Sequence, residues 1–161
     1  MVGPCIPQRS NCADCGSSCD TINDFILPGD AGTAINDIGT GCVGFSGYDD
    51  RTNESLCLSH NTYNLTVSCN YPSSELFSVW IDFNKNGVFE TTTEQIISNY
   101  GGITTSRTTI PFTIPGNVQA GVYTMRAVVA FAGGNPDPCI ATGFIQDGET
   151  HDYTVVITNA N

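Results

Sequence analysis

The fold is decided by the stretch TYNLTVSCNYPSSELFSVWIDF, residues 62–83. Its first part, residues 62–69, alternates apolar and polar side chains, and this period of two is typical of a strand with one buried face. A turn at Asn70-Tyr71-Pro72-Ser73 ends that strand. Residues 76–83 then form a denser apolar run that contains the only tryptophan, Trp80, which predicts a strand in the interior of a sheet.

The same kind of pattern recurs further along the chain. Residues 110–114 alternate again, and because proline cannot donate to a β-ladder, Pro111 predicts that this segment is an edge strand. Further strands are expected at 122–131 and 153–157, and weaker ones near Phe25, Phe45, Leu56, Ile96 and Phe144. Gly, Pro and Asn turns separate the segments, and no helix of three turns is predicted. We therefore expect an all-β fold, an antiparallel, jelly-roll-like β-sandwich.

Length and charge narrow the class of protein. The chain has 161 residues, enough for one domain with a substantial core. Acidic residues outnumber basic ones by 16 to 5, so there is no basic patch for phosphates or for an anionic membrane surface. No stretch approaches the roughly 20 apolar residues that span a bilayer. We expect no nucleic-acid partner and no membrane insertion.

The cysteine content indicates an oxidising compartment. Eight cysteines are dense for a domain of this size, so we expect disulfides in a secreted, extracellular or cell-surface protein. The cysteines are Cys5, Cys12, Cys15, Cys19, Cys42, Cys57, Cys69 and Cys139. Residues 1–20 hold four of them and no apolar periodicity, which predicts a stapled, irregular N-terminal arm or cap. The β-sandwich domain is expected at residues 21–161.

The sequence does not determine how the cysteines pair. A bond between Cys57 and Cys69 is the one pairing we favour, because a short hairpin would place them on adjoining strands. A four-thiolate zinc site at Cys5, Cys12, Cys15 and Cys19 is the less favoured alternative for the arm. The chain starts without the charged and apolar regions of a signal peptide, so we expect a leader that was removed or lies outside this numbering.

Residues 80–90, WIDFNKNGVFE, are the segment whose side chains indicate a binding site. Short oxygen-bearing side chains occupy alternate positions just after a strand, at Asp82, Asn84 and Asn86. Gly87 allows the chain to turn back so that these oxygens converge, as in the first half of a calcium loop. The backbone carbonyl of Val88 is the natural fourth ligand, by analogy with position 7 of an EF-hand loop. The sequence therefore predicts a bound Ca²⁺ ion.

The second half of this loop differs from an EF-hand. Position 12 is Thr93 instead of a bidentate glutamate, and no helices flank the loop. The missing carboxylate is expected from Glu90, from Glu94 or from a distant segment, for which Glu149 is the leading candidate. With one formal charge among its first ligands, the site is expected to be weak. The alternative is that Asn-Lys-Asn-Gly is only a hairpin turn.

These motifs resemble the GEVED domain, a β-rich module of secreted and surface-attached proteins. The family core Trp-Ile-Asp-x-Asn-x-Asn-Gly-x-Phe is matched at residues 80–89, and its terminal Gly-Glu-Val-Glu-Asp-Tyr is similar to residues 148–153. Ile-Pro, Gly and Met-Arg elements between them are matched at 114–115, 121 and 125–126, and the resemblance spans residues 22–158. It departs at Thr150 and His151, where the family has Val and Glu. The resemblance implies calcium binding and a surface role without shared enzymatic activity.

Three further features concern single residues. Arg126 lies in the central apolar run, and because a buried charge needs a partner, we expect it to form a structural ion pair with Glu149 or Asp152. Asn53-Glu54-Ser55 and Asn64-Leu65-Thr66 are N-glycosylation sequons. If these sequons are used, the faces that carry them are exposed to solvent.

No recognisable nucleophile and base accompany these features, so we expect a non-enzymatic structural module. A single module of this kind acts structurally most easily by assembling, as a homo-oligomer or helical polymer in a surface filament or fibril. The arm of residues 1–20, or an unpaired sheet edge, is the expected connector, because an extended segment can add to a neighbour's sheet. The alternative is a carbohydrate-binding or adhesion module that stacks glycans on Tyr48, Tyr71 or Tyr100.

Overall fold

The computed structural model describes residues 3–7, 9, 20–43, 47–71, 73–131, 135–140 and 147–159. Within these ranges the regular structure consists of nine strands and one short 3-10 turn, η1 (Asp30–Gly32). None of the described helical structure is long and apolar enough to cross a membrane. The nine strands confirm the expected all-β fold class.

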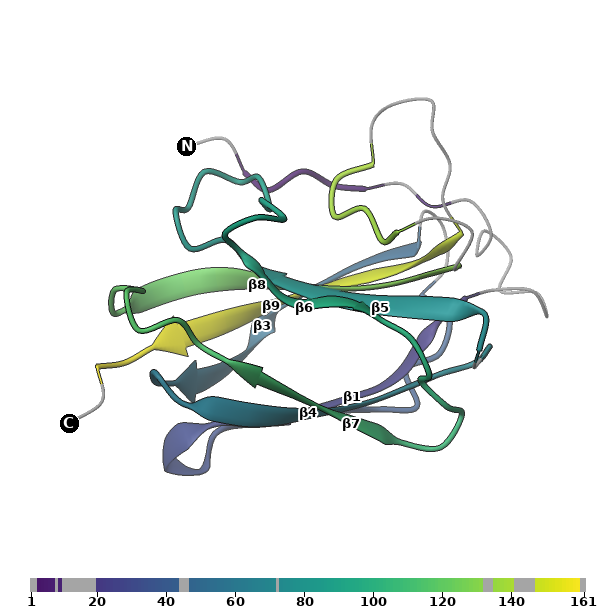
Figure 1. Ribbon diagram of the computed structural model, residues 1–161, viewed down its shortest axis with the longest axis horizontal. Helices are drawn as coiled ribbons and strands as arrows, with labels where there is room; N and C mark the ends of the chain where they lie inside the picture. Colours follow the sequence, from purple (N-terminus) through teal and green to yellow (C-terminus); the bar gives the residue numbers. More distant parts are fainter. Residues whose placement is uncertain are drawn as a thin grey trace.

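The strands form two sheets that pack face to face (Figure 1). One sheet has the order β2-β1-β4-β7 and consists of β1 (Ile22–Pro28), β2 (Ala34–Ile38), β4 (Thr62–Cys69) and β7 (Thr108–Thr113). The other has the order β3-β9-β8-β5-β6 and consists of β3 (Tyr48–Leu58), β5 (Glu75–Ile81), β6 (Gln95–Tyr100), β8 (Gly121–Phe131) and β9 (Gly148–Ile157).

Strand positions follow the sequence patterns with one difference. β7, which contains Pro111, is an edge strand, and β5, which contains Trp80, lies between β8 and β6. Phe45 and Phe144 lie outside the described residues. The difference is that β3 and β9 pair in parallel, so the sandwich is not wholly antiparallel. A parallel pair needs a long connection, and the chain between these two strands runs through β4, β5, β6, β7 and β8.

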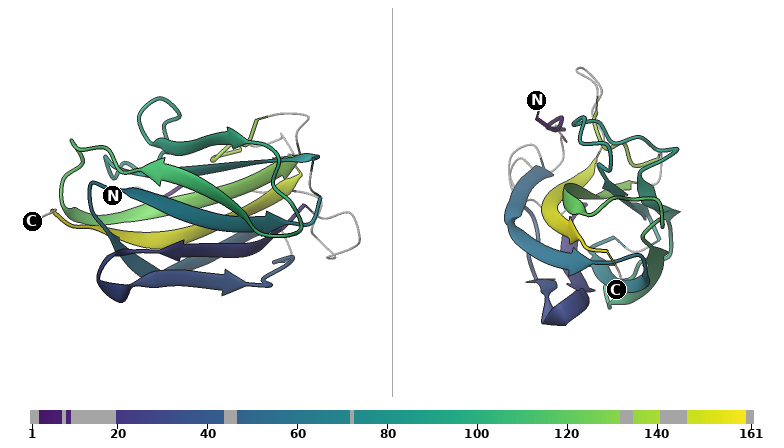
Figure 2. Two further views of the ribbon diagram at one scale, coloured as in Figure 1. Left: turned by 60° about the horizontal axis from the view of Figure 1, so that its bottom comes forward. Right: turned by 90° about the vertical axis from the view of Figure 1, so that its left-hand side faces the viewer.

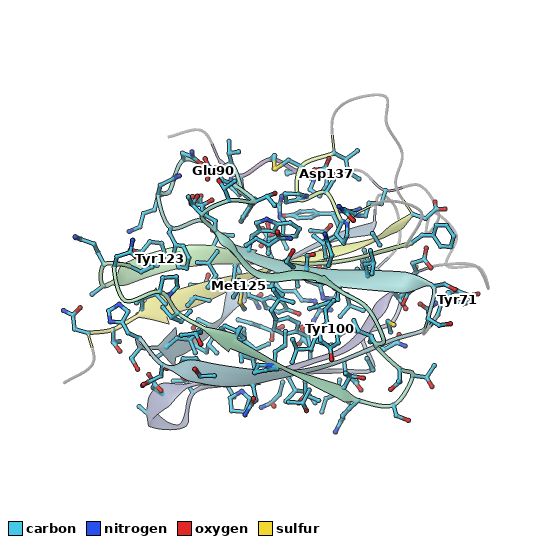
Figure 3. All side chains as sticks on the ribbon, in the orientation of Figure 1. Tyr71, Glu90, Tyr100, Tyr123, Met125 and Asp137 are labelled. Carbon is cyan, nitrogen blue, oxygen red and sulfur yellow. A yellow bond between two sulfur atoms is a disulfide. The ribbon has the colours of Figure 1, made fainter. Side chains whose placement is uncertain are left out.

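The core lies between the two sheets. Phe25 of β1 stacks on Tyr153 of β9 with ring centroids 4.6 Å apart, and Phe77 of β5 lies 6.5 Å from Phe25. Met125, labelled in Figure 3, is fully buried among these side chains. The alternating apolar positions of the strands thus supply the core, as their period of two requires.

A third layer covers the outer face of the five-stranded sheet. Trp80, Val128 and Ala130 point away from the core between the sheets and pack with Phe89, Cys5 and Cys139. The covering segments are the N-terminal arm, the loop 82–94 and residues 135–140, which lie together above the sheet in Figure 1. The end-on view in Figure 2 also places the arm and this loop on one side of the molecule. Because β5 and β8 are buried on both faces, their sequences are apolar almost throughout.

The described residues of the arm are held against their own domain. Cys5 forms a disulfide with Cys139, and its backbone N–H donates to the carbonyl of Gly87 at 3.2 Å. Arg9 is 3% exposed, and its guanidinium donates to Thr150 Oγ1 at 2.9 Å and to the carbonyl of Asp137 at 2.6 Å. Burial, opposed by the nearby Asp137 and assisted by Arg126, lowers the pKa of Arg9 to about 10. These contacts attach the described residues of the arm to the sandwich.

The predicted pairing of Cys57 with Cys69 is wrong. Cys57 and Cys69 are both free thiols, because Cys57 lies on β3 and Cys69 on β4, which belong to different sheets. The four-thiolate zinc site is excluded as well, since Cys5 is bonded to Cys139. Cys42 is disulfide-bonded, as expected. Cys12, Cys15 and Cys19 lie outside the described residues.

Cys69 lies in a buried acidic corner with Glu75 and Asp20. Burial of Glu75, which is 2% exposed, and its contact with Asp20 raise its pKa to about 8, although Cys69 opposes this shift. Glu75 therefore stays protonated in the folded chain at pH values where it is ionised in the unfolded chain. The folded state binds more protons between about pH 4.5 and 8, so the free energy of unfolding falls as the pH rises through this range.

We expect Glu75→Gln to remove the part of this dependence that Glu75 contributes, because the amide stays neutral at every pH; the part that comes from Glu94, whose pKa is also raised, should remain. The measurement is urea unfolding at pH 5, 7 and 8.5. Asp50→Asn is the matched control: the pKa of Asp50 is lowered by its bonds to Thr52, so its stability contribution changes only at acid pH. A slope that stays unchanged in Glu75→Gln would contradict the assignment.

Candidate metal site

The candidate metal site is the loop between β5 and β6, from Asp82 to Glu94. Lys85 and Gly87 adopt left-handed backbone conformations, with φ of 59° and 79°, and these reverse the chain. A glycine adopts this conformation without a steric penalty. Asp82, 6% exposed, and Glu94, 2% exposed, lie buried beneath the exposed residues 84–86 of the loop.

Bonds from side chains to the backbone hold the loop in shape. Asp82 accepts the backbone N–H groups of Asn86 at 3.1 Å and of Gly87 at 2.9 Å. Asn84 Oδ1 accepts from Asn86 N at 2.9 Å, and Asn86 Oδ1 accepts from Val88 N at 2.7 Å. Each of these oxygens has more than one lone pair. The alternate Asp and Asn positions therefore shape the loop and still have acceptor capacity for a cation.

Two glutamates complete the loop. Glu94 accepts the backbone N–H groups of Asn84 at 3.1 Å and of Glu90 at 3.0 Å. Glu90 accepts the side-chain amides of Asn84 at 3.1 Å and of Asn86 at 2.7 Å. Burial and the neighbouring Glu90 raise the pKa of Glu94 to about 7. The one nearby cation, Lys85, lies over the ring of Tyr123, with Nζ 4.6 Å from the centroid.

The donor set fits a hard cation. All its side-chain donors are oxygens, from Asp82, Asn84, Asn86, Glu90 and Glu94, and oxygen ligands are those of Ca²⁺ and not of soft metals. No three His, Cys, Asp or Glu side chains of the described chain are gathered as a metal site. A Ca²⁺ ion would therefore depend on the amide oxygens and on a backbone carbonyl, for which Val88 remains the candidate. Glu90, labelled in Figure 3, lies at the outer surface of this covering layer.

Glu149 is not part of this loop, contrary to the sequence-based expectation. Glu149, on β9, pairs with Val129 of β8, whereas Ile81, just before the loop, pairs with Met125, four residues away along β8. Glu149 is fully buried and accepts the backbone N–H groups of Ile22 at 3.1 Å and Val43 at 3.2 Å. Since side chains alternate along a strand, Glu149 faces the core while Asp152 faces outward. Glu94, the nearer alternative, lies at the end of the loop and accepts backbone N–H groups within it.

Arg126 is paired with Asp152, one of its two expected partners. The pair is bidentate, with Nε to Oδ1 and Nη2 to Oδ2 both at 2.7 Å, and both side chains are completely buried. Tyr48 donates its hydroxyl to Asp152 at 2.9 Å. The guanidinium carbon lies 4.4 Å from the centroid of the Phe89 ring, and Nη1 donates to the carbonyl of Pro138 at 2.7 Å. The arginine thus links β8 and β9 to the loop and to residues 135–140.

A second network of polar side chains, besides the Arg126–Asp152 pair, lies in the core. The sequence did not lead us to expect it. His151 Nε2 lies 2.9 Å from Glu149, and its Nδ1 lies 3.1 Å from the hydroxyl of Tyr153. Tyr153 donates to Asp37 at 2.8 Å, and Asp37 forms an ion pair with Arg51 at 2.8 Å. The sequence signal was the alternation of Glu149, His151 and Tyr153, which puts three polar side chains on one face of a strand.

A groove lies beside the loop on the outer face of β3, β9 and β8. Its volume is about 450 Å³, and its lining includes Tyr48, Asp50, Thr52, Lys85, Thr124 and Thr154. Thr52 donates to Asp50 from its backbone N–H at 3.0 Å and from its hydroxyl at 2.7 Å, which lowers the pKa of Asp50. Tyr71 and Tyr100, the other candidates for sugar stacking, are each 37% exposed and lie away from this groove. The sequon residues Asn53 and Asn64 are both exposed.

The family model of the GEVED domain matches residues 76–156. The chain belongs to the GEVED domain family. The matched range begins in β5 and ends in β9, so it contains the loop 82–94, Arg126 and Asp152. In this GEVED domain the family's two sequence motifs therefore meet in space, because the first supplies Phe89 and the second supplies Asp152, and both contact Arg126.

Comparisons beyond the family are distant. No curated protein sequence matches this GEVED domain. Among solved structures, a family 123 glycoside hydrolase from Clostridium perfringens, studied for glycolipid glycan hydrolysis, is similar over 73% of this chain. The sequence identity is 14%, the TM-score is 0.33, and the match covers 24% of the enzyme chain. The domain thus spans about a quarter of the length of that enzyme, and the similarity carries no argument about function.

Proposed function

We propose that this GEVED domain is a non-enzymatic structural module of an extracellular protein, braced by calcium and disulfides, that self-associates as a subunit of a surface filament or fibril. The observation that carries the proposal is the covering layer. The Cys5–Cys139 disulfide joins two of its three segments to each other, and the buried Arg126 of β8 contacts Pro138 and Phe89 in two of them. Such bracing resists unfolding outside the cell, where disulfides persist.

The contacts that the two histidines make also support a structural role. His151 is completely buried between Glu149 and Tyr153, and His60 Nε2 lies 2.8 Å from the carbonyl of Val118. Histidine is the side chain that most often acts as a general acid or base near neutral pH. In this chain both histidines contact structural groups, and neither lines the groove beside the loop.

Calcium is the proposed cofactor, and Asp82 is its central ligand. We expect added Ca²⁺ to raise the melting temperature, because a ligand that binds only the folded state stabilises it by about 2.7 kcal/mol at a hundredfold excess over Kd. Asp82→Ala should abolish this calcium-dependent shift. Asp50→Asn, in the adjacent groove, should keep it. Differential scanning calorimetry with calcium and with a chelator measures both, and an unchanged shift in Asp82→Ala would contradict the site.

Self-association is tested on the intact chain. The expected connector was the arm, but its described residues are fastened to their own domain, so a surface of the sandwich is the better candidate. Sedimentation velocity in calcium and then in a chelator, with electron microscopy of any pellet, should show assemblies larger than a monomer. A monomer under both conditions would contradict self-association.

The groove beside the loop favours a second candidate function, carbohydrate binding. Tyr48, Asp50 and the hydroxyls of Thr52, Thr124 and Thr154 line it, and such groups can hydrogen-bond sugar hydroxyls. Retention on a glycan column in calcium, with release by a chelator and loss in Thr52→Ala, would support this function. Absence of retention on a broad glycan panel would contradict it.

A further inference from the structure

The outer face of the four-stranded sheet differs from the rest of the surface. We call it the neutral face, and it consists of the outward-pointing positions of β2, β1, β4 and β7. One row across it runs from Asn36 to Ile26 to Thr66 to Thr109, each residue paired with the next on the adjacent strand. None of the four is charged. The strands of this face are described completely, so its composition is known.

Charge is almost absent from the neutral face. The chain carries a formal net charge of −11 from 16 acidic and 5 basic residues. At the outward positions of these four strands the only ionised side chain is Asp24, and it forms an ion pair with Arg107 at 3.2 Å. This face is therefore neutral, and the excess negative charge lies elsewhere on the molecule.

The polar groups of the neutral face are partly satisfied within the sheet. The hydroxyls of Thr62 and Thr113 lie 2.8 Å apart, and those of Thr66 and Thr109 lie 3.2 Å apart. A hydroxyl that already has a partner costs less to remove from water than a free one. Ile38, at the edge strand β2, is 60% exposed. Depletion of charged residues is the compositional mark of the centre of a protein interface.

We propose that the neutral face is where a second copy of this chain docks, sheet against sheet. Two copies that each carry −11 repel one another, and the repulsion is least when the surfaces that meet are uncharged. At physiological ionic strength charges are screened within about 8 Å, whereas packed sheets lie about 10 Å apart. Charges outside the contact are thus largely screened. The pairing is two-fold, so each face meets its equivalent and this contact by itself closes a dimer; growth into a filament needs a second contact elsewhere on the surface.

This inference rests on the proposed self-association and names the surface that carries it. The test introduces charge without changing shape, through Asn36→Asp and Asn64→Asp together on the neutral face. The matched control is Asn53→Asp and Asn117→Asp, at exposed positions on β3 and in the loop before β8. Both variants add the same net charge. Protein from a host without N-glycosylation keeps the Asn64 and Asn53 sequons, one in each variant, from affecting the comparison.

Sedimentation velocity over a range of concentrations measures the dissociation constant of each protein. We expect the neutral-face variant to dissociate at least tenfold more readily than the wild type, and high salt to restore part of its association. The control should associate like the wild type. Equal weakening of both variants, or none in the neutral-face variant, would overturn the assignment of the face while leaving self-association intact. A wild type that stays monomeric would overturn self-association and this inference together.

Discussion

Asp152→Ala should lower the free energy of unfolding by about 3–5 kcal/mol, the largest effect expected of any single substitution in this domain. The substitution leaves the guanidinium of Arg126 completely buried without its carboxylate partner. It also removes the acceptor of the Tyr48 hydroxyl. Because a buried charge without a partner is far costlier than a buried pair, most of the loss comes from the remaining arginine. Urea unfolding followed by tryptophan fluorescence measures it, since Trp80 of β5 packs against Phe89, which also contacts Arg126.

The control removes both charges. Arg126→Met combined with Asp152→Leu should recover much of the stability lost in Asp152→Ala, because a buried ion pair can often be replaced by apolar side chains at little cost. Arg51→Met, at the half-buried cation that pairs with Asp37, should cost less because Arg51 keeps contact with solvent. A loss below about 1 kcal/mol in Asp152→Ala would show that water reaches Arg126 in solution.

The second large effect is expected from the disulfide between the arm and residues 135–140. Cys5→Ser with Cys139→Ser should lower the free energy of unfolding by about 2–5 kcal/mol, because the bond closes most of the chain into one loop. The sequence separation of the two cysteines is 134. Cys57→Ser, at a half-buried free thiol, is the matched control and should have a much smaller effect. Equal stability of the disulfide variant and the wild type would contradict the bracing role of the arm.

The same variant should weaken calcium binding. The N–H of Cys5 donates to the carbonyl of Gly87, inside the loop, so the disulfide helps to hold the loop in its folded shape. Linkage requires the converse as well: a ligand that orders the loop must protect the disulfide from reduction. Calorimetric titration of both proteins with calcium measures the first effect. Reduction by a dithiol in calcium and in chelator measures the second.

The strands and the loop could be predicted from the sequence because they depend on local chemistry. Alternation at residues 62–69 predicts a half-buried strand, Pro111 predicts an edge, and the Asp-x-Asn-x-Asn-Gly spacing predicts a loop closed by its own side-chain oxygens. Each of these features depends on residues a few positions apart. The structure agrees with all three.

Only the tertiary structure decided which distant residues meet. The hairpin expected between Cys57 and Cys69 fails because β3 and β4 belong to different sheets. Glu149 faces the core instead of the loop, and Asp152, three residues later, faces Arg126. The dense apolar run around Trp80 was attributed to a central strand, but the covering layer over the sheet is the additional cause.

The physical reason for this division is the range of the interactions. Turn geometry, strand periodicity and loop oxygens act between neighbours in the chain, so their patterns are visible in the sequence itself. Sheet order, the parallel pairing of β3 with β9 and the partner of Cys5 depend on how segments more than a hundred residues apart pack together. The neutral face likewise becomes a surface only when β2, β1, β4 and β7 lie side by side.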